Sequence, residues 1–556
     1  MSGSQSYNLL CKEWIPVIWR DDAAAEPRAL KIGIREALQR AHDIQCISHT
    51  APFIEFGLYR LLITIVLDAH IVAGQRPTIG KMRTMLDKGQ FDEPIVDQYL
   101  KSQSGCFDLW AKDVPFLQCR PASHGGKQPS PKAVVSMFPA IPSGTNVAHW
   151  HHYGEDEATL SEDIAAQLLT TVSPFNFKVK PGEARTLAGD PPLYALVLGK
   201  NLFETIVLNL PRPSGRITAK QEQDNGPAWR TQLDLTKLPK TPTVAQGFTW
   251  PVRVIELENE GAMVAKAINQ AAYNKPTDKA KGKGGNLYDA KYGWRDPSAG
   301  TETTRDAMTH IKARPGVPIW RDAVPLFLVA SEGETLRADR RRSRPEVISN
   351  ALRVLDTPQF RVAVYGMRKK GGGGDVKVEE WFRSVLTLPT EVARDSRLSA
   401  RAIDAFKTTQ KVADALQTGL RMLRAPSESK KAARKDTHRE EGDALAIFWQ
   451  SLEPVLSHSY LRARGASTRD DEGQVGLEPV LSHSYLDALA RNDSKAEEGL
   501  WDKVWRQARE AFSGATGPHR RTADGLFRIA NASNWFERKL ATLLPKPLRE
   551  KSEKSA

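Results

Sequence analysis

The sequence has 556 residues, of which 40% are apolar, enough for a full core in about two to four domains. Lys and Arg total 79 against 66 Asp and Glu, which gives a formal net charge of +13. These values exclude a wholly disordered chain and favour a polyanionic partner, either nucleic acid or an anionic membrane surface.

Cysteine usage and the first residues bear on the cellular compartment. Cys11, Cys46, Cys106 and Cys119 are too far apart to form a CxxC pair. We therefore expect buried, reduced thiols and neither a disulfide scaffold nor a cysteine zinc site. The first ten residues lack the segments of a secretory signal, and the most apolar run, residues 58–67, is too short to cross a bilayer. The sequence predicts a cytoplasmic protein without a membrane partner.

The first part of the chain mixes strand and helix patterns. Apolar residues alternate over residues 7–19, which predicts short strands. They recur every three or four positions over residues 52–73, which predicts a core helix. A stretch with several Pro and Gly over residues 119–142 predicts a long surface loop, and a helix is expected to begin at about Ser161.

The middle of the chain, residues 175–389, combines apolar β-like runs with loops rich in Pro, Gly and Lys. This pattern indicates an α+β organisation with excursions between the strands. Strands are predicted for residues 194–198, 206–210 and 252–257.

The pattern becomes helical beyond residue 389. Four amphipathic helices are predicted in succession, two of them by capping boxes. The first helix has its apolar face over residues 403–423, and the second starts near the Thr437/Glu440 box. The third follows the Ser494/Glu497 box, and the fourth runs through residues 526–544.

These elements predict an α+β fold class with two parts. A large mixed N-terminal domain is expected over residues 1–390, followed by a C-terminal four-helix bundle over residues 391–556.

Ten residues, Leu-Glu-Pro-Val-Leu-Ser-His-Ser-Tyr-Leu, occur twice, at 452–461 and 477–486. The offset of 25 residues is nearly seven helical turns, but the residues between the copies are poor helix formers. Two copies are too few for a solenoid. We expect a tandem duplication, inserted near residues 462–493 as a loop or a helix extension; an error of sequence assembly is the alternative.

Enzyme motifs are incomplete in this sequence. Residues 74–81 resemble a phosphate loop, but five residues separate the glycines and Met82 stands where Ser or Thr would hold magnesium. The pair His42-Asp43 lacks the further ligands of a hydrolytic metal site. We expect a protein that is not an enzyme, with no catalytic residue, no cofactor and no metal site.

The run His149-Trp150-His151-His152 is the densest group of imidazoles in the sequence. Adjacent residues of an extended chain point to opposite faces, and no carboxylate or cysteine stands at a recognised ligand spacing. The run therefore favours a contact surface over a metal site.

Two groups of basic residues lie in loop-like sequence, and the second leads into four glycines. Glycine lets the backbone approach a ligand closely and cations contact phosphates, which suits a segment beside a DNA groove. A solvated loop without a partner is the alternative. The groups are Lys275, Lys279, Lys281 and Lys283, and then Arg368, Lys369 and Lys370 before residues 371–374.

Short motifs follow one another over nearly the whole chain. They are Asn8-Leu9-Leu10 with Trp14-Ile15-Pro16-Val17, Pro115-Phe116-Leu117-Gln118, Ser143-Gly144-Thr145-Asn146, Val207-Leu208-Asn209-Leu210, Gly247-Phe248-Thr249-Trp250 and Ile255-Glu256-Leu257. Their order, together with the helical end of the chain, resembles the CasA family, the large subunit of the type I-E CRISPR Cascade surveillance complex.

The resemblance implies a large α+β domain, a C-terminal four-helix bundle and a role without catalysis. Members of this family dock at the crRNA 5′ handle, inspect duplex DNA for a protospacer-adjacent motif (PAM), help to open the duplex for R-loop formation, and recruit the Cas helicase-nuclease. The implied partners are crRNA, double-stranded target DNA, the helicase-nuclease and the backbone, small and handle-binding subunits of Cascade. Base pairing with the guide reads the target sequence.

The resemblance also implies an RNA-proximal and PAM-proximal loop. Residues Gly144, Thr145 and Asn146, followed by His149 and Trp150, resemble the family's loop at the crRNA handle. Trp150 is expected to stack on a base or, alternatively, to be buried against a neighbouring subunit.

Two further segments resemble the DNA contacts of the family. Lys283, or else Lys281, stands upstream of Trp294 as the family's minor-groove lysine stands upstream of its own Trp. The sequence Arg368-Lys369-Lys370-Gly371 resembles by position the hairpin that wedges into DNA, without the family's amide-bearing wedge. The family's glycine-rich loop is expected near residues 175–182, where this sequence reads Phe-Asn-Phe-Lys-Val-Lys-Pro-Gly, and the zinc-binding cysteines of some relatives have no counterpart.

Minor-groove edges distinguish little more than A·T from G·C, so several PAM sequences should be tolerated. Basic residues of the expected bundle would bind the displaced strand or a small-subunit partner. Two other functions stay open, a metal-dependent nuclease using residues 149–152 and a basic scaffold that binds only protein. The basic residues of the bundle are Arg421, Arg424, Lys430, Lys431, Arg434 and Lys435.

Overall fold

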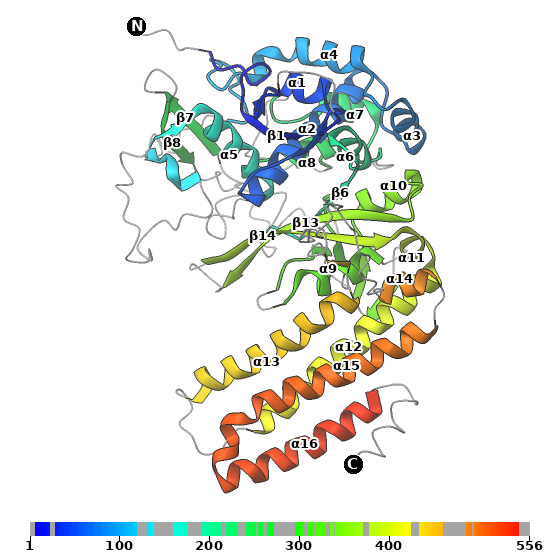
Figure 1. Cartoon of the computed structure of the whole chain (residues 1–556). Helices are drawn as coiled ribbons and strands as arrows, with labels where there is room; N and C mark the ends of the chain where they lie inside the picture. Colours follow the sequence, from blue (N-terminus) through cyan, green and yellow to red (C-terminus); the bar gives the residue numbers. More distant parts are fainter. Residues whose placement is uncertain are drawn as a thin grey trace, which may run out of the picture. The chain divides into compact units, whose positions relative to one another are not determined.

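The computed structural model of the chain combines helices with small sheets (Figure 1). It divides into two compact units, Met1–Ala313 with Thr335–Asp356 and Ala363–Arg383, and Arg314–Glu334 with Thr357–Val362 and Ser384–Ala556. The residues it describes are 6–22, 28–118, 131–137, 159–175, 191–213, 217–230, 241–251, 254–259, 264–271, 295–303, 308–314, 317–328, 334–337, 340–370, 377–423, 433–456, 458–459, 485–491 and 494–543.

The first unit begins with a three-stranded antiparallel sheet. Its central strand β1 (Ile15–Trp19) pairs with β2 (Lys31–Ile32) and β3 (Ile44–Ile47), and α1 (Ile34–Gln39) connects these two strands. The strand β1 confirms the prediction of short strands over residues 7–19 for the last five of these residues, 15–19.

The long helix α2 (Pro52–Val72) lies in the core of the first unit. Pro52 fits its first turn, where no intrahelical N–H is needed. Nineteen of its 21 residues are buried, as expected for a helix that is packed on all sides. The core helix predicted for residues 52–73 is confirmed, and it also buries ionisable side chains, namely Glu55, Arg60, Asp68 and His70.

Shorter helices of the first unit surround α2, and α4, α5, α6, α7 and α8 contact it. The helix expected near Ser161 is confirmed as α5. Gly80 of the phosphate-loop resemblance lies inside α3, and Met82 is buried. The bounds are α3 (Ile79–Lys88), α4 (Glu93–Ser102), η1 (Ser104–Phe107), α5 (Glu162–Phe175), α7 (Ala219–Asp224) and α8 (Val244–Thr249).

The strand predicted for residues 206–210 is wrong, because the chain forms the helix α6 (Leu202–Leu208) there. The Asn201 side chain caps this helix by accepting a 2.8 Å hydrogen bond from the Glu204 backbone N–H. A short apolar run does not distinguish a buried helix from a buried strand, and the polar cap lies outside the run.

The first unit contains two further small sheets. In one, β8 (Val264–Ala271) pairs with β4 (Pro131–Ala133), β5 (Leu160–Ser161) and β7 (Val254–Asn259). The other has the order β10-β9-β12-β11. β7 confirms the strand predicted for residues 252–257 with a shift of two residues. The remaining bounds are η2 (Val134–Met137), β9 (Thr301–Thr303), β10 (Met308–His310), β11 (Glu334–Arg337) and β12 (Arg340–Ser343).

Two long consecutive strands, β13 (Gln359–Lys370) and β14 (Lys377–Pro389), are hydrogen-bonded neighbours and lie side by side (Figure 1). We call them the β13–β14 hairpin. Its residues 363–383 belong to the first unit. There β13 pairs with β6 (Tyr194–Leu198), the strand predicted for these residues, and α10 (Glu346–Val354) contacts β6.

The second unit consists mainly of helices. α12 (Ser396–Met422) contacts α13 (Ala433–Leu456), α15 (Ser494–Ala515) and α16 (Ala523–Leu543), and α13 contacts α15. Asp395 caps α12 by accepting hydrogen bonds from the backbone N–H groups of Arg397 and Leu398. The other elements are α9 (Ile319–Leu328), α11 (Thr390–Arg394), β15 (His458–Ser459), α14 (Tyr485–Ala490) and η5 (Gly517–Arg521).

The capping box predicted at Thr437 is wrong, because α13 begins four residues earlier at Ala433. Residues 433–435 are good helix formers and extend the helix past the expected start. The helix expected after Ser494 begins at this residue.

The duplicated sequence contributes to two helices. Residues 452–456 of the first copy form the end of α13, and Tyr485 and Leu486 of the second copy begin α14. Residues 461–484, which include the rest of the second copy, lie outside the described residues.

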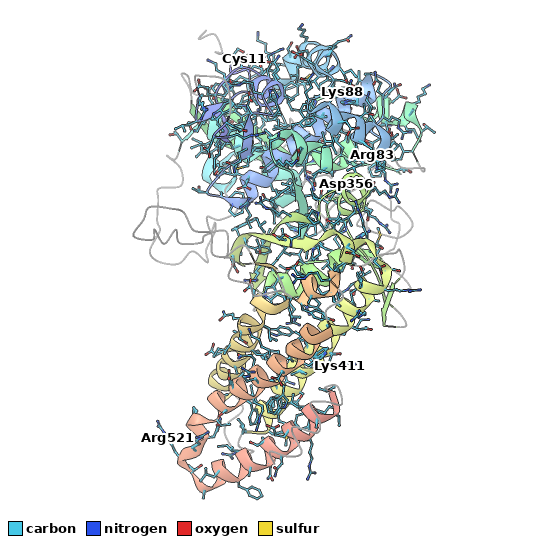
Figure 2. All side chains as sticks on the ribbon, turned by 45° about the vertical axis from the view of Figure 1, so that its right-hand side comes forward. Cys11, Arg83, Lys88, Asp356, Lys411 and Arg521 are labelled. Atoms are coloured by element: carbon cyan, nitrogen blue, oxygen red, sulfur yellow. The ribbon has the colours of Figure 1, made fainter. Side chains whose placement is uncertain are left out.

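The prediction of buried thiols is wrong for Cys11, which is exposed in a turn (Figure 2). Its N–H bonds back to the Asn8 carbonyl, so the turn directs this residue outward. Cys46 and Cys106 are half-buried, and Cys119 lies outside the described residues. In the part of the chain that the structure describes, no helix has the length and apolarity needed to cross a membrane.

Candidate nucleic-acid interface

A buried carboxylate on α2 joins the helix to both strands of the β13–β14 hairpin. The Tyr365 hydroxyl donates to Glu55 Oε1 at 2.5 Å, and Arg383 Nε lies 2.8 Å from the same oxygen. Burial raises the pKa of Glu55, while the charge of Arg383 and the Tyr365 hydroxyl oppose this shift. We call Glu55, Tyr365 and Arg383 the Glu55 cluster.

Aromatic rings surround the Glu55 cluster. Phe53 of α2 lies 4.7 Å from Trp381 of β14, and Phe56 of α2 lies 5.2 Å from Tyr365, measured between ring centroids. Trp381 also meets Phe175, the last residue of α5, at 5.5 Å. These contacts exclude water from the carboxylate and hold the end of α5 beside the hairpin.

One turn further along α2, Arg60 binds a second distant segment. Its Nη2 donates to Asp296 at 2.7 Å, and both side chains are almost fully buried. The guanidinium lies against the ring of Phe248, at 4.4 Å from its centroid, and also near the rings of Phe56 and Tyr194. A buried ion pair of this kind is strongly disrupted when either partner is removed.

His310 completes this second group. Its Nε2 accepts a 3.1 Å hydrogen bond from the Asp296 backbone N–H, which requires a neutral ring with the proton on Nδ1. Burial lowers the pKa of His310 to about 4. We call Arg60, Asp296 and His310 the Arg60 cluster.

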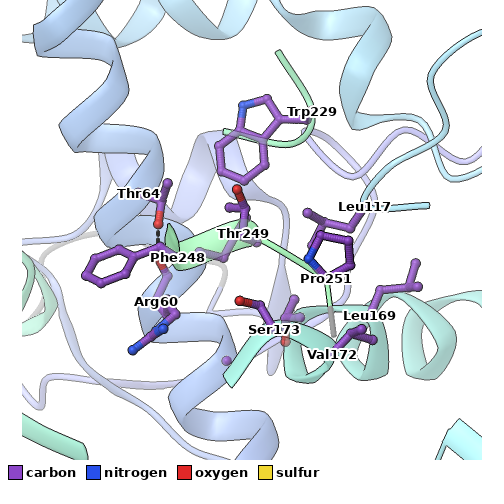
Figure 3. A pocket seen from close by; sticks show the side chains of 13 residues that line it. Arg60, Thr64, Leu117, Leu169, Val172, Ser173, Trp229, Phe248, Thr249 and Pro251 are labelled. Atoms are coloured by element: carbon purple, nitrogen blue, oxygen red, sulfur yellow. Dashed lines mark hydrogen bonds between the residues drawn. The ribbon is translucent and has the colours of Figure 1, made fainter. Parts of the chain in front are cut away.

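A small pocket opens beside Arg60 between α2, α5 and α8 (Figure 3). Thr64, Trp229 and Phe248 contribute to its wall, and the Thr64 hydroxyl donates to the Arg60 carbonyl. A volume of about 20 Å³ has room for roughly one water molecule and not for a nucleotide. This pocket is therefore too small to bind a nucleotide.

Contacts of α2 lie in or near three of the segments expected at DNA. Phe175, which contacts Phe56, is the first residue of the stretch expected to hold the glycine-rich loop. Asp296 lies 13 residues after Lys283, the last of the four lysines that define the lysine-bearing loop. The Glu55 cluster lies on the β13–β14 hairpin, whose first strand ends in Arg368-Lys369-Lys370. The first turns of α2 thus contact at least one described residue in or near each of these segments.

Arg368 is the predicted DNA contact whose surroundings the structure describes most fully. It pairs with Glu380 of β14 and lies 5.6 Å from the ring centroid of Phe382. Its side chain is 19% exposed, whereas that of Glu380 is 46% exposed. An approaching phosphate would therefore compete with Glu380 for this guanidinium.

The structure places the other predicted residues less completely. Lys369 and Lys370 are the last residues of β13, Arg421 is exposed in the last turn of α12, and Arg434 and Lys435 lie in the first turn of α13. The following lie outside the described residues: Gly144, Thr145, Asn146, His149, Trp150, Lys281, Lys283, Gly371, Arg424, Lys430 and Lys431.

Sequence reasoning missed Glu55, Arg60 and Asp296. The available signal was the presence of ionisable residues within a run too apolar for a surface helix, because a buried charge requires a partner. Among the residues that the structure describes, no group of three or more His, Cys, Asp or Glu is arranged to hold a metal ion. Residues 149–152 are not among them.

Several motif residues of the sequence analysis have polar structural roles. Gln118 donates to the Leu109 carbonyl at 2.7 Å and accepts from the Leu257 N–H at 2.7 Å. Asn209 joins the end of α6 to Val197 of β6 through two hydrogen bonds. These amides connect segments that are far apart in sequence, so the motifs mark the framework of the first unit.

The family model of the CRISPR-associated protein Cse1 matches residues 8–488. The chain belongs to the Cse1 (CasA) family. This confirms the family resemblance that the motifs indicated. The CasA/Cse1 protein of Thermus thermophilus is 29% identical over 278 residues, which cover 47% of this Cse1-family chain and 51% of that protein. The chain thus spans about half of the length of this curated relative in the match.

Solved structures of this family share the fold of the chain. Cse1 from Acidimicrobium ferrooxidans is 22% identical with a TM-score of 0.67, and the match covers 98% of this chain and 99% of that one. A chain of a CRISPR RNA-guided surveillance complex is 19% identical with a TM-score of 0.62, covering 97% and 100%. At these identities the likeness establishes the fold.

Proposed function

We propose that this Cse1-family chain is the large subunit of a crRNA-guided type I-E Cascade complex. In this role it recognises the PAM in duplex DNA, helps to open the duplex for R-loop formation and recruits the Cas helicase-nuclease, with no active site of its own. Family membership carries the proposal. The shared fold with a chain of an RNA-guided surveillance complex supports it.

The physical features of the chain agree with this role. A net charge of +13 favours binding to a nucleic-acid backbone. The α2 helix contacts Phe175, Asp296 and the β13–β14 hairpin, which lie in or near three segments with proposed DNA contacts, and a rigid support of this kind suits a groove reader. Because the complementary guide RNA reads the target, the protein needs only a short motif check and charge.

The proposal extends to partners and organisation. We assign PAM recognition and docking on the crRNA handle to residues 1–390, and a four-helix bundle made of α12, α13, α15 and α16 to residues 391–556. The partners are crRNA, double-stranded DNA, the other Cascade subunits and the helicase-nuclease, in the cytoplasm.

The test is target binding by the reconstituted complex when Lys281, Lys283, Lys369 and Lys370 are all replaced by Gln. If these four lysines contact phosphates, target affinity falls. The slope of log affinity against log salt also becomes smaller by about 3.6, at about 0.9 for each contact. Binding is measured over a salt series with a target that carries the preferred motif.

The control variant has the same change in charge at four exposed lysines of the first unit. It should bind like the parent complex. If the first variant also keeps the affinity and slope of the parent, the chain is a protein-binding scaffold. Divalent-metal-dependent cleavage of DNA by the purified chain, lost with alanine at His151 and His152, would instead establish a nuclease. The control lysines are Lys12, Lys88 (Figure 2), Lys101 and Lys200.

A further inference from the structure

The Glu55 cluster joins α2 to two strands through one oxygen atom. Glu55 Oε1 accepts from Tyr365 of β13 and pairs with Arg383 of β14, and Arg383 Nε also lies 3.3 Å from the Tyr365 hydroxyl. The three groups therefore form a closed triangle. Ring packing tolerates sliding, whereas hydrogen bonds to a charged group are directional, so the triangle defines where the strands lie on the helix.

The contacts along the hairpin follow a single register. Tyr365 meets Arg383, and Arg368 meets Glu380, so the contacts advance by three residues in opposite directions along the two strands. The Arg368 pair thus lies about 10 Å nearer to the end of β13 than the Glu55 cluster, at about 3.3 Å per residue. Anything that fixes Tyr365 and Arg383 also fixes the strand that carries Arg368.

The two faces of the hairpin differ in what they contact. Tyr365, Trp381 and Arg383 meet α2, whereas Arg368 and Glu380 lie an odd number of residues away and so belong to the opposite face. The face away from α2 therefore carries Arg368, while the face towards α2 holds the hairpin in place.

We propose that Glu55, acting through Tyr365 and Arg383, is a positioning residue that fixes the β13–β14 hairpin on α2, so that the cationic end of β13 meets the DNA duplex in one orientation for strand separation. The proposal rests on the proposed function. It assigns to residues 55, 365 and 383 a role in duplex opening that requires no contact with DNA.

The same helix offers a matched control. Asp68 of α2 is also buried and accepts a 2.6 Å hydrogen bond from the Tyr99 hydroxyl, and Arg230 binds both of its oxygens at 2.7 and 2.8 Å. This second Tyr-Arg-carboxylate group joins α2 to α4 and to residue 230, with no residue of the hairpin in it. Removing either tyrosine hydroxyl is the same chemical change at two places.

The experiment compares Tyr365→Phe and Arg383→Met with Tyr99→Phe in the assembled complex. Fluorescence of 2-aminopurine placed beside the PAM reports duplex opening, and a target with a premade bubble at the same place reports binding alone. Hydrogen exchange of residues 363–370 and 377–383 in the purified chain reports the order of the hairpin. Arg383→Lys retains a positive charge for Glu55.

We expect Tyr365→Phe and Arg383→Met to raise exchange in the hairpin and to slow opening of intact duplex by about tenfold, the order of one lost hydrogen bond to a charged group. Binding of the bubble target should stay at the parent level, Arg383→Lys should restore part of the opening rate, and Tyr99→Phe should leave opening unchanged.

Four results would overturn the proposal. Opening at the parent rate by Tyr365→Phe and Arg383→Met would show that the cluster does not position the hairpin for this step. An equal loss with Tyr99→Phe, or an equal loss on the bubble target, would show a general defect. If the parent complex itself does not open the duplex, the proposed function is wrong and the positioning role is wrong with it. If the parent complex opens the duplex and the variants open it equally fast, only the positioning role is wrong.

Discussion

Replacing Arg60 by Met tests whether the Arg60 cluster holds the segment after the lysine-bearing loop. The side chains of Arg60 and Asp296 are 5% and 6% exposed, so the Asp296 carboxylate would stay buried without its cation. Removing one member of a buried ion pair costs about 3–5 kcal/mol, mainly because the other charge stays buried. We expect Arg60→Met to lower the free energy of local opening of residues 295–300 by this amount.

The double variant Arg60→Met/Asp296→Asn isolates the ion pair. The double variant carries no uncompensated charge. Its loss of free energy of local opening should therefore be about 2 kcal/mol smaller than the sum of the losses of the two single variants. Hydrogen exchange of peptides covering residues 295–300 measures each free energy of opening. This local measurement suits a chain of two units, for which one global unfolding free energy is not defined.

A surface ion pair provides the control for this cycle. Arg35 Nη1 lies 3.8 Å from Asp97, and both side chains are partly exposed. Arg35→Met should cost about 1 kcal/mol or less. If the Arg60 and Asp296 variants have additive costs, or if Arg60→Met costs no more than Arg35→Met, the pair does not hold the segment.

Three further predictions concern the stability of the fold. Burial lowers the pKa of His310 to about 4, so below pH 6.5 the unfolded chain binds more protons than the native one. The free energy of unfolding of the first unit should therefore fall by about 2 kcal/mol between pH 8 and pH 5. His310→Gln should remove this loss in urea titrations. A Cβ on Gly57 would lie 2.4 Å from Thr170 Oγ1, so Gly57→Ala should lower the free energy of local opening of α2 by about 1–3 kcal/mol in hydrogen exchange, whereas Gly80→Ala, whose Cβ would meet Thr78 Oγ1 at an ordinary 3.9 Å, should not destabilise α3. Hydrogen bonds from backbone N–H groups lower the pKa of Asp395, so Asp395→Ala should speed exchange in the first turn of α12 at neutral pH and lose this effect as acid protonates the carboxylate.

The sequence predicted the elements whose pattern is local. The periodicity of residues 52–73 located α2, and the strand at residues 194–198 was predicted to the residue. The error at α6 has a local cause as well, since the cap residue Asn201 lies outside the apolar run. The start of α13 was placed too late because a suitable cap residue, Thr437, also occurs inside a helix.

The two clusters on α2 were beyond local reasoning. Glu55 and Tyr365 are 310 residues apart in the sequence, and Arg60 and Asp296 are 236 apart. No periodicity connects such positions, and many pairings of charges satisfy the same composition. What the sequence did contain was the demand for a partner, because four ionisable residues occur on a helix with almost no exposed surface. The lysines expected at the DNA remain predictions.

The repeated decapeptide bears on how the length of this chain can change. Its first five residues close α13 in one copy, and its last two open α14 in the other. A single copy would therefore contain both the stop of one helix and the start of the next, separated by the same Ser-His-Ser tripeptide. A deletion of 25 residues that leaves one copy would keep the same pair of helix boundaries. The chain length could therefore change at this place without altering the residues that end α13 and begin α14.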